Sequence, residues 1–265
     1  MAKTLIALLT DFGTRDHYAG VMKGVVLGIN PDVTLVDLSH DLPAHDIPFA
    51  AQELAATYKF YPSGTIFLVV VDPGVGSARR GLAADAGDWR FVAPDNGVLT
   101  AVFQESPPKK VVELTERRYA RPTVSRTFEG RDRFAPAAAW LSKGVHLTAF
   151  GRPVTDYHLL DIPKPVLDEG TLRGTVVRID RFGNVVTNLD RRSCERFADG
   201  GGALQLTVRD HSIARIVSTY SDIPPGDLAA LFGSTDTLEV AAQETSAAER
   251  LGVAVGDPVE LKRTL

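Results

Sequence analysis

The chain has 265 residues, of which 44% are hydrophobic, and a formal net charge of −4. Such a composition supports a folded core and one large or two smaller domains, and it excludes extensive disorder. The acidic balance, with no run of Lys and Arg longer than a pair, argues against nucleic acid as a partner.

One cysteine and a short N-terminal apolar stretch bear on where the protein resides. Cys194 is the only cysteine, so neither an intrachain disulfide nor a cysteine-based metal site can form, which suits a reducing compartment. The apolar stretch before Asp11 has only about seven residues, too few for a secretion signal or a membrane span. We therefore expect a cytoplasmic protein that does not associate with a membrane.

Strands and helices alternate through the first half of the chain. The expected strands cover residues 5–10, 33–38, 65–71 and 89–93, and the expected helices cover residues 17–30 and 47–58. Asp16 is a candidate N-cap for the first helix, which should end at Asn30-Pro31. This alternation predicts an α/β domain with a mostly parallel sheet packed against helices.

Three of the expected strands end in turns that carry an aspartate, namely Asp11, Asp72 and Asp95. In open α/β sheets, ligands bind in the crevice beyond the carboxyl ends of the strands, so the repetition favours one crevice lined with carboxylates. The turn at Asp72 leads into Pro-Gly-Val-Gly and then Arg79 and Arg80, a combination that brings backbone and charge close to a ligand. Taken alone, this turn is equally compatible with an aspartate that caps backbone amides and with arginines in solvent.

The second half of the chain changes character. A helix with Phe134 on its inner face follows Gly130-Arg131-Asp132, and Pro136 is tolerated there because it lies in the first turn. Residues 161–172 contain two prolines and little periodicity, and strands dominate after them, which predicts a small β-barrel or sandwich. The expected domains are an N-terminal α/β domain over residues 1–160, a linker over 161–172 and a β domain over 173–265.

Several common chemistries have no signal in this sequence. It lacks a dinucleotide-binding glycine motif after a strand, a phosphate-binding P-loop and a nucleophile-elbow serine. Its six histidines do not show the spacing of metal ligands. A set of aspartates could still hold Mg²⁺, so the residues alone leave open a metal-dependent phosphoester hydrolase.

Short motifs follow one another along nearly the whole chain: Thr10-Asp11-Phe12-Gly13, Asp16-x-Tyr18, Met22-Lys23-Gly24, Val71-Asp72-Pro73-Gly74-Val75-Gly76, Ala93-Pro94-Asp95-Asn96-Gly97, Gly130-Arg131-Asp132 with Phe134-Ala135-Pro136, and Asp180-x-Phe182-Gly183-Asn184-x-x-Thr187-Asn188. In these motifs the chain resembles the S-adenosylmethionine (SAM) hydroxide adenosyltransferases. Those enzymes are adenosine-forming SAM hydrolases and relatives of the fluorinases and chlorinases.

The resemblance implies both a fold and a reaction. The fold is an N-terminal α/β sandwich-type domain with a mostly parallel sheet and a small C-terminal β-barrel domain. The assembly is a homotrimer with each site between one chain's N-terminal domain and its neighbour's C-terminal domain. The reaction is in-line attack of water or hydroxide on the C5′ carbon of SAM, giving adenosine and L-methionine. It needs no metal and no cofactor, because SAM is the substrate and its sulfonium leaves as a neutral thioether.

The resemblance assigns catalytic roles to Asp72 and Arg79, which would hold and polarise the attacking water. The family's third catalytic residue is a histidine, and this chain has Glu129 at that position. Either Glu129 takes the histidine's place beside the water, or it is a surface carboxylate paired with Arg131 or Arg133.

The resemblance also assigns the substrate-binding residues. Asp11 matches the ribose-binding aspartate, since a carboxylate can accept hydrogen bonds from both hydroxyls of a cis-diol. Asn184 matches the residue that reads the adenine edge. The remaining binding residues are Asp16, Asp180 and Ser234 at the methionine end, His45 and Phe182 as wall or stacking residues, and Asn96.

Two hypotheses of different class therefore stand. The first is a SAM hydrolase with an altered third catalytic residue. The second is a catalytically weak SAM- or adenosine-binding protein on the same scaffold. A halogenase is disfavoured, because the halogenating relatives carry a tyrosine at the position of Asp72 and an aromatic residue at that of Glu129. A carboxylate at the latter position would also repel a halide.

Overall fold

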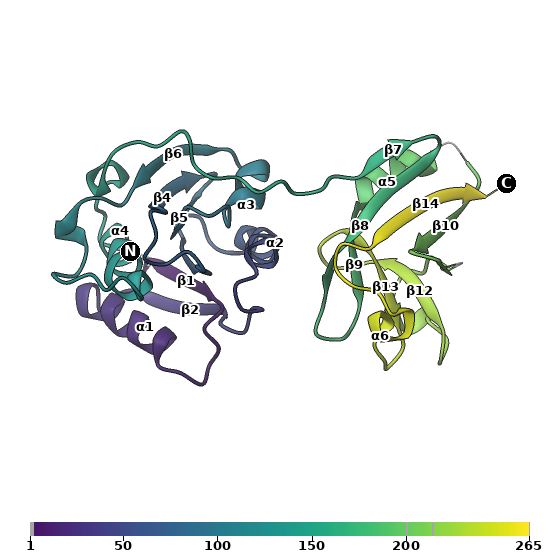
Figure 1. Cartoon of the computed structure of the whole chain (residues 1–265), viewed down its shortest axis with the longest axis horizontal. Coiled ribbons are helices and arrows are strands. Elements are labelled where there is room, and N and C mark those ends of the chain that lie inside the picture. Colours follow the sequence, from purple (N-terminus) through teal and green to yellow (C-terminus); the bar gives the residue numbers. More distant parts are fainter. Residues whose placement is uncertain (1–2, 200, 214, 265) are drawn as a thin grey trace. The chain divides into compact units, whose positions relative to one another are not determined.

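The computed structural model describes residues 3–199, 201–213 and 215–264 of the chain. They form two compact units, Met1–Asp161 and Ile162–Leu265 (Figure 1). Among the helices of the described residues, none is both long and apolar enough to cross a bilayer.

A six-stranded sheet forms the centre of the N-terminal unit. Its strands are β1 (Leu5–Thr10), β2 (Thr34–Ser39), β3 (Ile66–Val70), β4 (Gly81–Ala86), β5 (Trp89–Pro94) and β6 (Pro108–Glu113), in the order β2-β1-β3-β5-β4-β6. The first three of these strands and β5 run parallel, whereas β4 and β6 are antiparallel to their neighbours. The expected α/β sheet is confirmed. Sequence analysis did not locate β4, because its alanine-rich segment lacks the β-branched residues typical of strands.

Helices cover both faces of this sheet (Figure 1). They are α1 (Tyr18–Ile29), α2 (Ile47–Thr57), α3 (Thr100–Glu105) and α4 (Ala135–Ser142), with a π-helical turn over Gly130–Phe134 and 3₁₀ turns over Tyr58–Phe60, Arg117–Tyr119 and Leu147–Phe150. Successive residues of β3 pack on opposite faces of the sheet. Leu68 packs with residues of α1 and α4, and Val69 packs with residues of α2 and α3. Burial on both faces explains the continuous apolar run that predicted this strand.

The first two helices begin in different ways. Asp46 caps α2, because its carboxylate accepts a hydrogen bond from the Phe49 N–H at 2.9 Å. The expected cap of α1 by Asp16 is wrong. The N-cap residue of α1 is His17, whose side chain makes no capping hydrogen bond, and Asp16 lies exposed one residue earlier.

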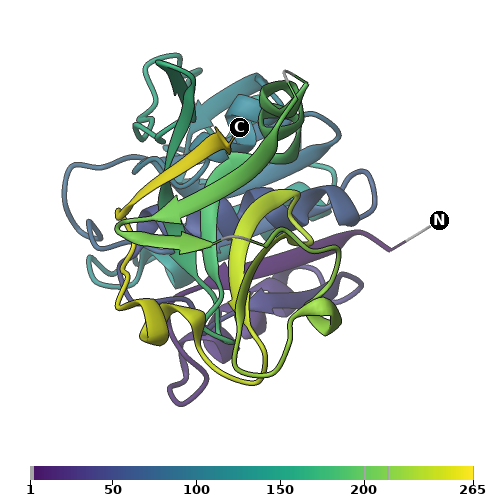
Figure 2. The same ribbon diagram turned by 90° about the vertical axis from the view of Figure 1, so that its right-hand side faces the viewer.

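An antiparallel sheet curls around the core of the C-terminal unit (Figure 2). Its strands are β7 (Val166–Asp168), β8 (Thr171–Ile179), β9 (Val185–Asp190), β10 (Ala203–Val208), β11 (His211–Ile213), β12 (Leu228–Phe232), β13 (Thr237–Ala242) and β14 (Pro258–Thr264). They follow the order β11-β10-β14-β8-β9-β13-β12, with β7 paired to β8. The remaining elements are α5 (Arg191–Ala198), α6 (Ala247–Leu251) and a 3₁₀ turn over Tyr220–Asp222. This sheet confirms the expected barrel-type domain.

The strand β7 lies within the stretch expected to be a linker. The part of that stretch without regular structure covers residues 161–165, and β8 begins at Thr171. The side chains of Val166 and Leu167 are 58% and 65% exposed, although their backbones pair with β8. Backbone pairing without burial leaves no alternation of apolar and polar residues from which this strand could be predicted.

Candidate active site

The carboxyl ends of β1 and β3 lie side by side, because Thr10 is in register with Val70. Asp11 and Asp72 follow these strands, and both line one cavity of about 230 Å³ together with His45, Phe128 and Glu129. The expected crevice at this edge of the sheet therefore contains two of the three aspartate turns.

The third turn, at Asp95, is an ion-pair site instead. The Asp95 carboxylate accepts hydrogen bonds from Arg80 Nε at 2.7 Å and from the His158 N–H at 2.7 Å. Arg80 also donates to Asp156 at 2.8 Å. These contacts tie the end of the N-terminal unit to the turn after β5, and they fit the alternative that such aspartates cap backbone groups and pair with arginines.

Asp72 and Arg79 form a bidentate ion pair. Arg79 Nε donates to Asp72 Oδ1 at 2.8 Å, and Arg79 Nη2 donates to Asp72 Oδ2 at 2.5 Å. The intervening turn brings the two residues together, with Gly76 in the left-handed region at a φ of 79°. The Arg79 side chain is only 9% exposed, and the Asp72 side chain is only 5% exposed. A buried fork-to-carboxylate pair of this kind fixes the orientation of both groups.

Glu129 completes a buried three-membered cluster. Its Oε2 lies 2.8 Å from Arg79 Nη2, and its side chain is 11% exposed. Arg133 is more distant, at 3.8 Å, and Arg131 pairs with Asp132. Of the two alternatives left open for Glu129, this burial contradicts the surface carboxylate paired with Arg131 or Arg133.

One oxygen of Glu129 is left without a hydrogen bond. Oε2 is buried and close to Arg79, but the guanidinium N–H is not aligned to donate to it. At this distance the guanidinium charge of Arg79 compensates the negative charge of the Glu129 carboxylate.

Burial raises the pKa of Asp72 above its ordinary value, although Arg79 opposes this shift by hydrogen bonding and by charge. The negative charges of Glu129 and Asp11 raise it further. A carboxylate with a raised pKa is a stronger base once ionised, so this environment suits proton acceptance.

The wall of the cavity includes residues that sequence analysis did not single out. Phe128 packs edge-on against Phe12 and Tyr18, with ring centroids 5.9 Å and 5.2 Å apart. The loop that carries Phe128 is held by Asp132, which is fully buried and accepts a hydrogen bond from the Ser125 N–H at 2.8 Å. Phe12 and Phe128 lie on loops, so no periodicity in the sequence placed them in the cavity, whereas Tyr18 is the first residue of α1.

The other predicted residues of the N-terminal unit occupy different surroundings. Asp11 accepts a hydrogen bond from the His45 N–H at 2.8 Å, which draws the His45 backbone into the left-handed region at a φ of 66°. Asp16 is exposed and does not line the cavity. The Asn96 amide is engaged by backbone groups, since it donates to the Val71 carbonyl at 2.9 Å and accepts from the Val98 N–H at 3.2 Å.

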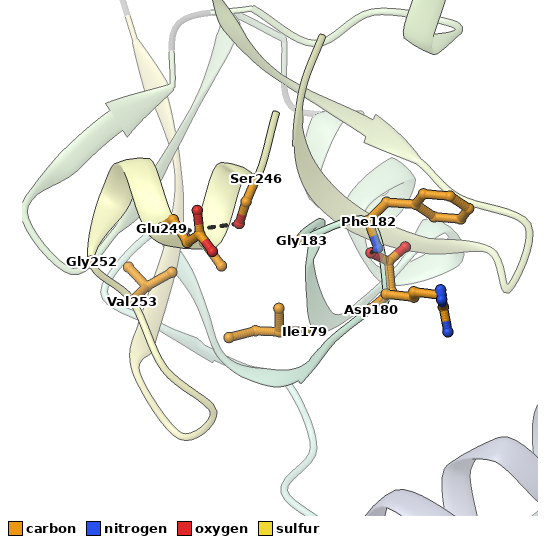
Figure 3. A pocket seen from close by; sticks show the side chains of 10 residues that line it. Ile179, Asp180, Phe182, Gly183, Ser246, Glu249, Gly252 and Val253 are labelled. Atoms are coloured by element: carbon orange, nitrogen blue, oxygen red, sulfur yellow. Dashed lines mark hydrogen bonds between the residues drawn. The ribbon is translucent and has the colours of Figure 1, made fainter. Parts of the chain in front are cut away.

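A second pocket, of about 480 Å³, lies in the C-terminal unit (Figure 3). Asp180 and Phe182 line it, and the Phe182 side chain is 77% exposed. Asp180 organises its own loop, because its two carboxylate oxygens accept hydrogen bonds from the Phe182 N–H, the Asn184 N–H and the Asn184 amide, each at 2.9 Å. Asn184 is therefore brought together with Asp180, whereas Ser234 is exposed in the turn between β12 and β13.

Ser246 and Glu249 also line this second pocket and were not predicted (Figure 3). The Ser246 hydroxyl accepts a hydrogen bond from the Glu249 N–H at 3.1 Å and so caps α6. The Ala248 N–H donates to the Gly183 carbonyl at 2.9 Å, which joins α6 to the Asp180 loop. The spacing Ser-x-x-Glu before an apolar stretch is a known helix-start signal, and it could have located this element.

These features define a class: an α/β unit with an ion-paired carboxylate cluster at its sheet edge, joined to a β-barrel unit with a pocket of its own. Residues 6–151 match the SAM hydroxide adenosyltransferase N-terminal domain, and residues 174–260 match the corresponding C-terminal domain. The chain belongs to the SAM hydroxide adenosyltransferase family.

Individual relatives agree with this placement. The chain is 39% identical to the (R)-S-adenosyl-L-methionine hydrolase of Thermus thermophilus, over 97% of this chain and 98% of that protein. It is 35% identical to the hydrolase of the same name from Salinispora tropica, over 95% of each. A fluorinase of Actinoplanes is 29% identical over 74% of this chain and 75% of its own. A crystal structure of an uncharacterized conserved protein from Thermotoga maritima superimposes with a TM-score of 0.91 at 34% identity, covering 97% of this chain and all of that one.

Proposed function

We propose that this protein hydrolyses SAM to adenosine and L-methionine. The observation that carries the proposal is the buried cluster of Asp72, Arg79 and Glu129, of which Asp72 and Glu129 line the same cavity as Asp11. Relatives that carry the name (R)-S-adenosyl-L-methionine hydrolase and cover almost the whole chain support it.

In the proposed reaction a water oxygen bonds to C5′ while the C5′–S bond breaks and its electron pair stays on sulfur. The water proton passes to a carboxylate. Asp72 is the base in this scheme, because its pKa is raised by burial, and Arg79 holds its orientation. The Glu129 carboxylate, which lines the same cavity, accepts a hydrogen bond from the second O–H of the water and aims the oxygen at C5′.

The binding roles are likewise proposals. Asp11 accepts hydrogen bonds from the ribose diol, beside the His45 wall, and its geometry supports this role because it faces the same cavity as the catalytic cluster. Asp180, Phe182 and Asn184 bind from the barrel side. The remaining assignments are Asp16 and Ser234 at the methionine end, and Asn96, whose amide already has two backbone partners.

We further propose a homotrimer in which the N-terminal domain of one chain and the C-terminal domain of its neighbour share each substrate. The cavity of about 230 Å³ supports this, because sites for drug-sized ligands occupy roughly 300–1,000 Å³. A complementation experiment tests it. Co-expressed Asp72→Asn and Asn184→Ala chains should regain about one quarter of parental activity, since random mixing unites the two intact halves in that share of interfaces. A mixture no more active than its separate components would contradict shared sites.

The reaction is proposed to need no metal or cofactor. Both Asp72 oxygens already accept hydrogen bonds from Arg79, which leaves this carboxylate poorly placed as a metal ligand. Turnover of SAM should therefore be unchanged after exhaustive treatment with EDTA. If EDTA abolished activity and Mg²⁺ restored it, a metal-dependent hydrolase would be the better reading.

The direct test of the function is incubation of the purified protein with SAM, followed by chromatography for adenosine and methionine in equal amounts. Asp72→Asn protein is the control for non-enzymatic decay. Binding of adenosine without product above that control would favour the catalytically weak binding protein.

A further inference from the structure

His40 is a buried histidine that the proposed reaction does not use. It follows β2 directly, and its side chain is 6% exposed. β2 pairs with β1, and the register shifts between Leu8 and Leu9 just before the strand ends. This irregularity lies immediately before Thr10 and Asp11, so His40 stands beside the turn that carries the proposed ribose-binding carboxylate.

His40 is bonded to residues on both sides of Asp11. Its Nδ1 lies 2.8 Å from the Thr10 hydroxyl, and its carbonyl accepts a hydrogen bond from the Gly13 N–H at 2.7 Å. The Thr10 hydroxyl in turn accepts from the Phe12 N–H at 3.4 Å. The backbone on both sides of Asp11 is thus held by the side chain and the carbonyl of His40.

A charged pair, Asp37 and Lys23, lies on the other side of the ring from Thr10. His40 Nε2 lies 3.0 Å from Asp37 Oδ1, although off the line of a hydrogen bond, and Lys23 Nζ lies 2.6 Å from Asp37 Oδ2. Burial acts to raise the pKa of Asp37, but contacts with Lys23 and His40 outweigh it and hold that pKa below its ordinary value. An ionised Asp37 favours the tautomer with hydrogen on Nε2, which leaves Nδ1 to accept from the Thr10 hydroxyl.

The direction of the hydrogen bonds that link Phe12, Thr10 and His40 explains how His40 steadies the turn. When Thr10 donates to Nδ1, both lone pairs of its oxygen are available to the Phe12 N–H. Thr10 is fully buried, so water cannot replace either partner. Loss of the histidine would leave a buried hydroxyl free to rotate and would loosen the turn on which Asp11 sits.

We infer that His40, acting through Thr10, is a positioning residue that holds Asp11 in the orientation needed to accept both ribose hydroxyls. This inference rests on the proposed function, since it assigns the cavity at Asp11 to the ribose. His40 touches neither the substrate nor the reacting atoms, so its effect should appear in binding rather than in the chemical step.

The test compares Thr10→Val, His40→Leu and His40→Asn with the parental protein. Thr10→Val is nearly isosteric, and His40→Asn keeps a polar atom near the position of Nδ1. Thr10→Val and His40→Leu should each raise the KM for SAM and the Kd for adenosine about tenfold, with kcat within about threefold of the parental value. His40→Asn should recover most of the lost affinity.

A matched control is Thr65→Val. Thr65 lies at the amino end of β3, so it is at the end of the sheet away from Asp11. Thr65 is equally buried, and its hydroxyl donates to the Pro62 carbonyl at 2.7 Å, just before β3. This substitution should alter thermal stability but neither KM nor adenosine affinity. If His40→Leu fails to fold, Thr10→Val still carries the comparison.

The proposed binding of the ribose hydroxyls by Asp11 can be tested separately, with a nucleoside that lacks them. The parental protein should bind adenosine more tightly than 2′,3′-dideoxyadenosine, and Thr10→Val should shrink this ratio about tenfold by weakening adenosine alone. An unchanged ratio, or equal effects on kcat and KM, would overturn the role of His40 while leaving SAM hydrolysis intact. A parental protein that bound no adenosine and released none from SAM would overturn both.

Discussion

Asp72→Asn is expected to lower the turnover of SAM by about a hundred- to ten-thousand-fold while changing the KM little. The amide keeps the size of the carboxylate but cannot accept a proton, and a general base is typically worth that factor. It also loses one of the two acceptors for Arg79, which donates to both oxygens of Asp72. Turnover at saturating SAM, measured with adenosine affinity on the same preparation, separates the chemical step from binding.

Asp95→Asn is the matched control for this substitution. Asp95 also follows a parallel strand and also pairs with an arginine, Arg80, but the pair does not line the cavity. Its replacement should leave kcat near the parental value. Equal turnover by Asp72→Asn and the parental protein would remove Asp72 from the mechanism.

The pH dependence of kcat/KM should report the environment of Asp72. Because burial raises its pKa, the acidic limb should lie above the ordinary carboxyl value of about 4. A carboxyl whose pKa is raised in the folded state adds stability at low pH and loses it as the pH rises through that pKa. Asp72→Asn should therefore show a smaller loss of stability between acidic and neutral pH than the parental protein, measured by thermal unfolding across that range.

Glu129→Ala is expected to lower turnover by about a hundredfold or more, because it removes a buried carboxylate that lies 2.8 Å from Arg79 and would orient the water. Glu129→His should retain activity. Its acidic limb should move upward towards the ordinary histidine pKa of about 6.5, because an imidazolium must lose its proton before it can accept a hydrogen bond from the water.

The measurement is turnover against pH for the parental protein, Glu129→Ala and Glu129→His at saturating SAM. Glu113→Ala is the control, since Glu113 also pairs with an arginine, Arg152, at 2.8 Å but lies on β6 outside the cavity. Three superimposable profiles would make Glu129 a bystander and would leave Asp72 and Arg79 to carry the chemistry.

The sequence by itself determined those strands, helices and turns that depend only on neighbouring residues. The strand β3 could be predicted because burial on both faces requires a continuous apolar run, and the helix α2 has local causes too, since Asp46 caps it and Pro48 fits its first turn. Position-by-position motifs likewise placed Asp11, Asp72 and Arg79 at one site. Turns and caps depend on a few neighbouring residues and can often be predicted from them, although the expected cap of α1 by Asp16 did not form.

Tertiary structure alone decided which of the charged residues act together. The sequence made Asp11, Asp72 and Asp95 equivalent, and packing turned Asp95 towards Arg80 while the other two face one cavity. Sequence left Glu129 between two roles, and the fold buried it against Arg79. The reason is physical. An ion pair between distant segments depends on register, burial and the removal of water, and these are set only when the strands and loops have packed.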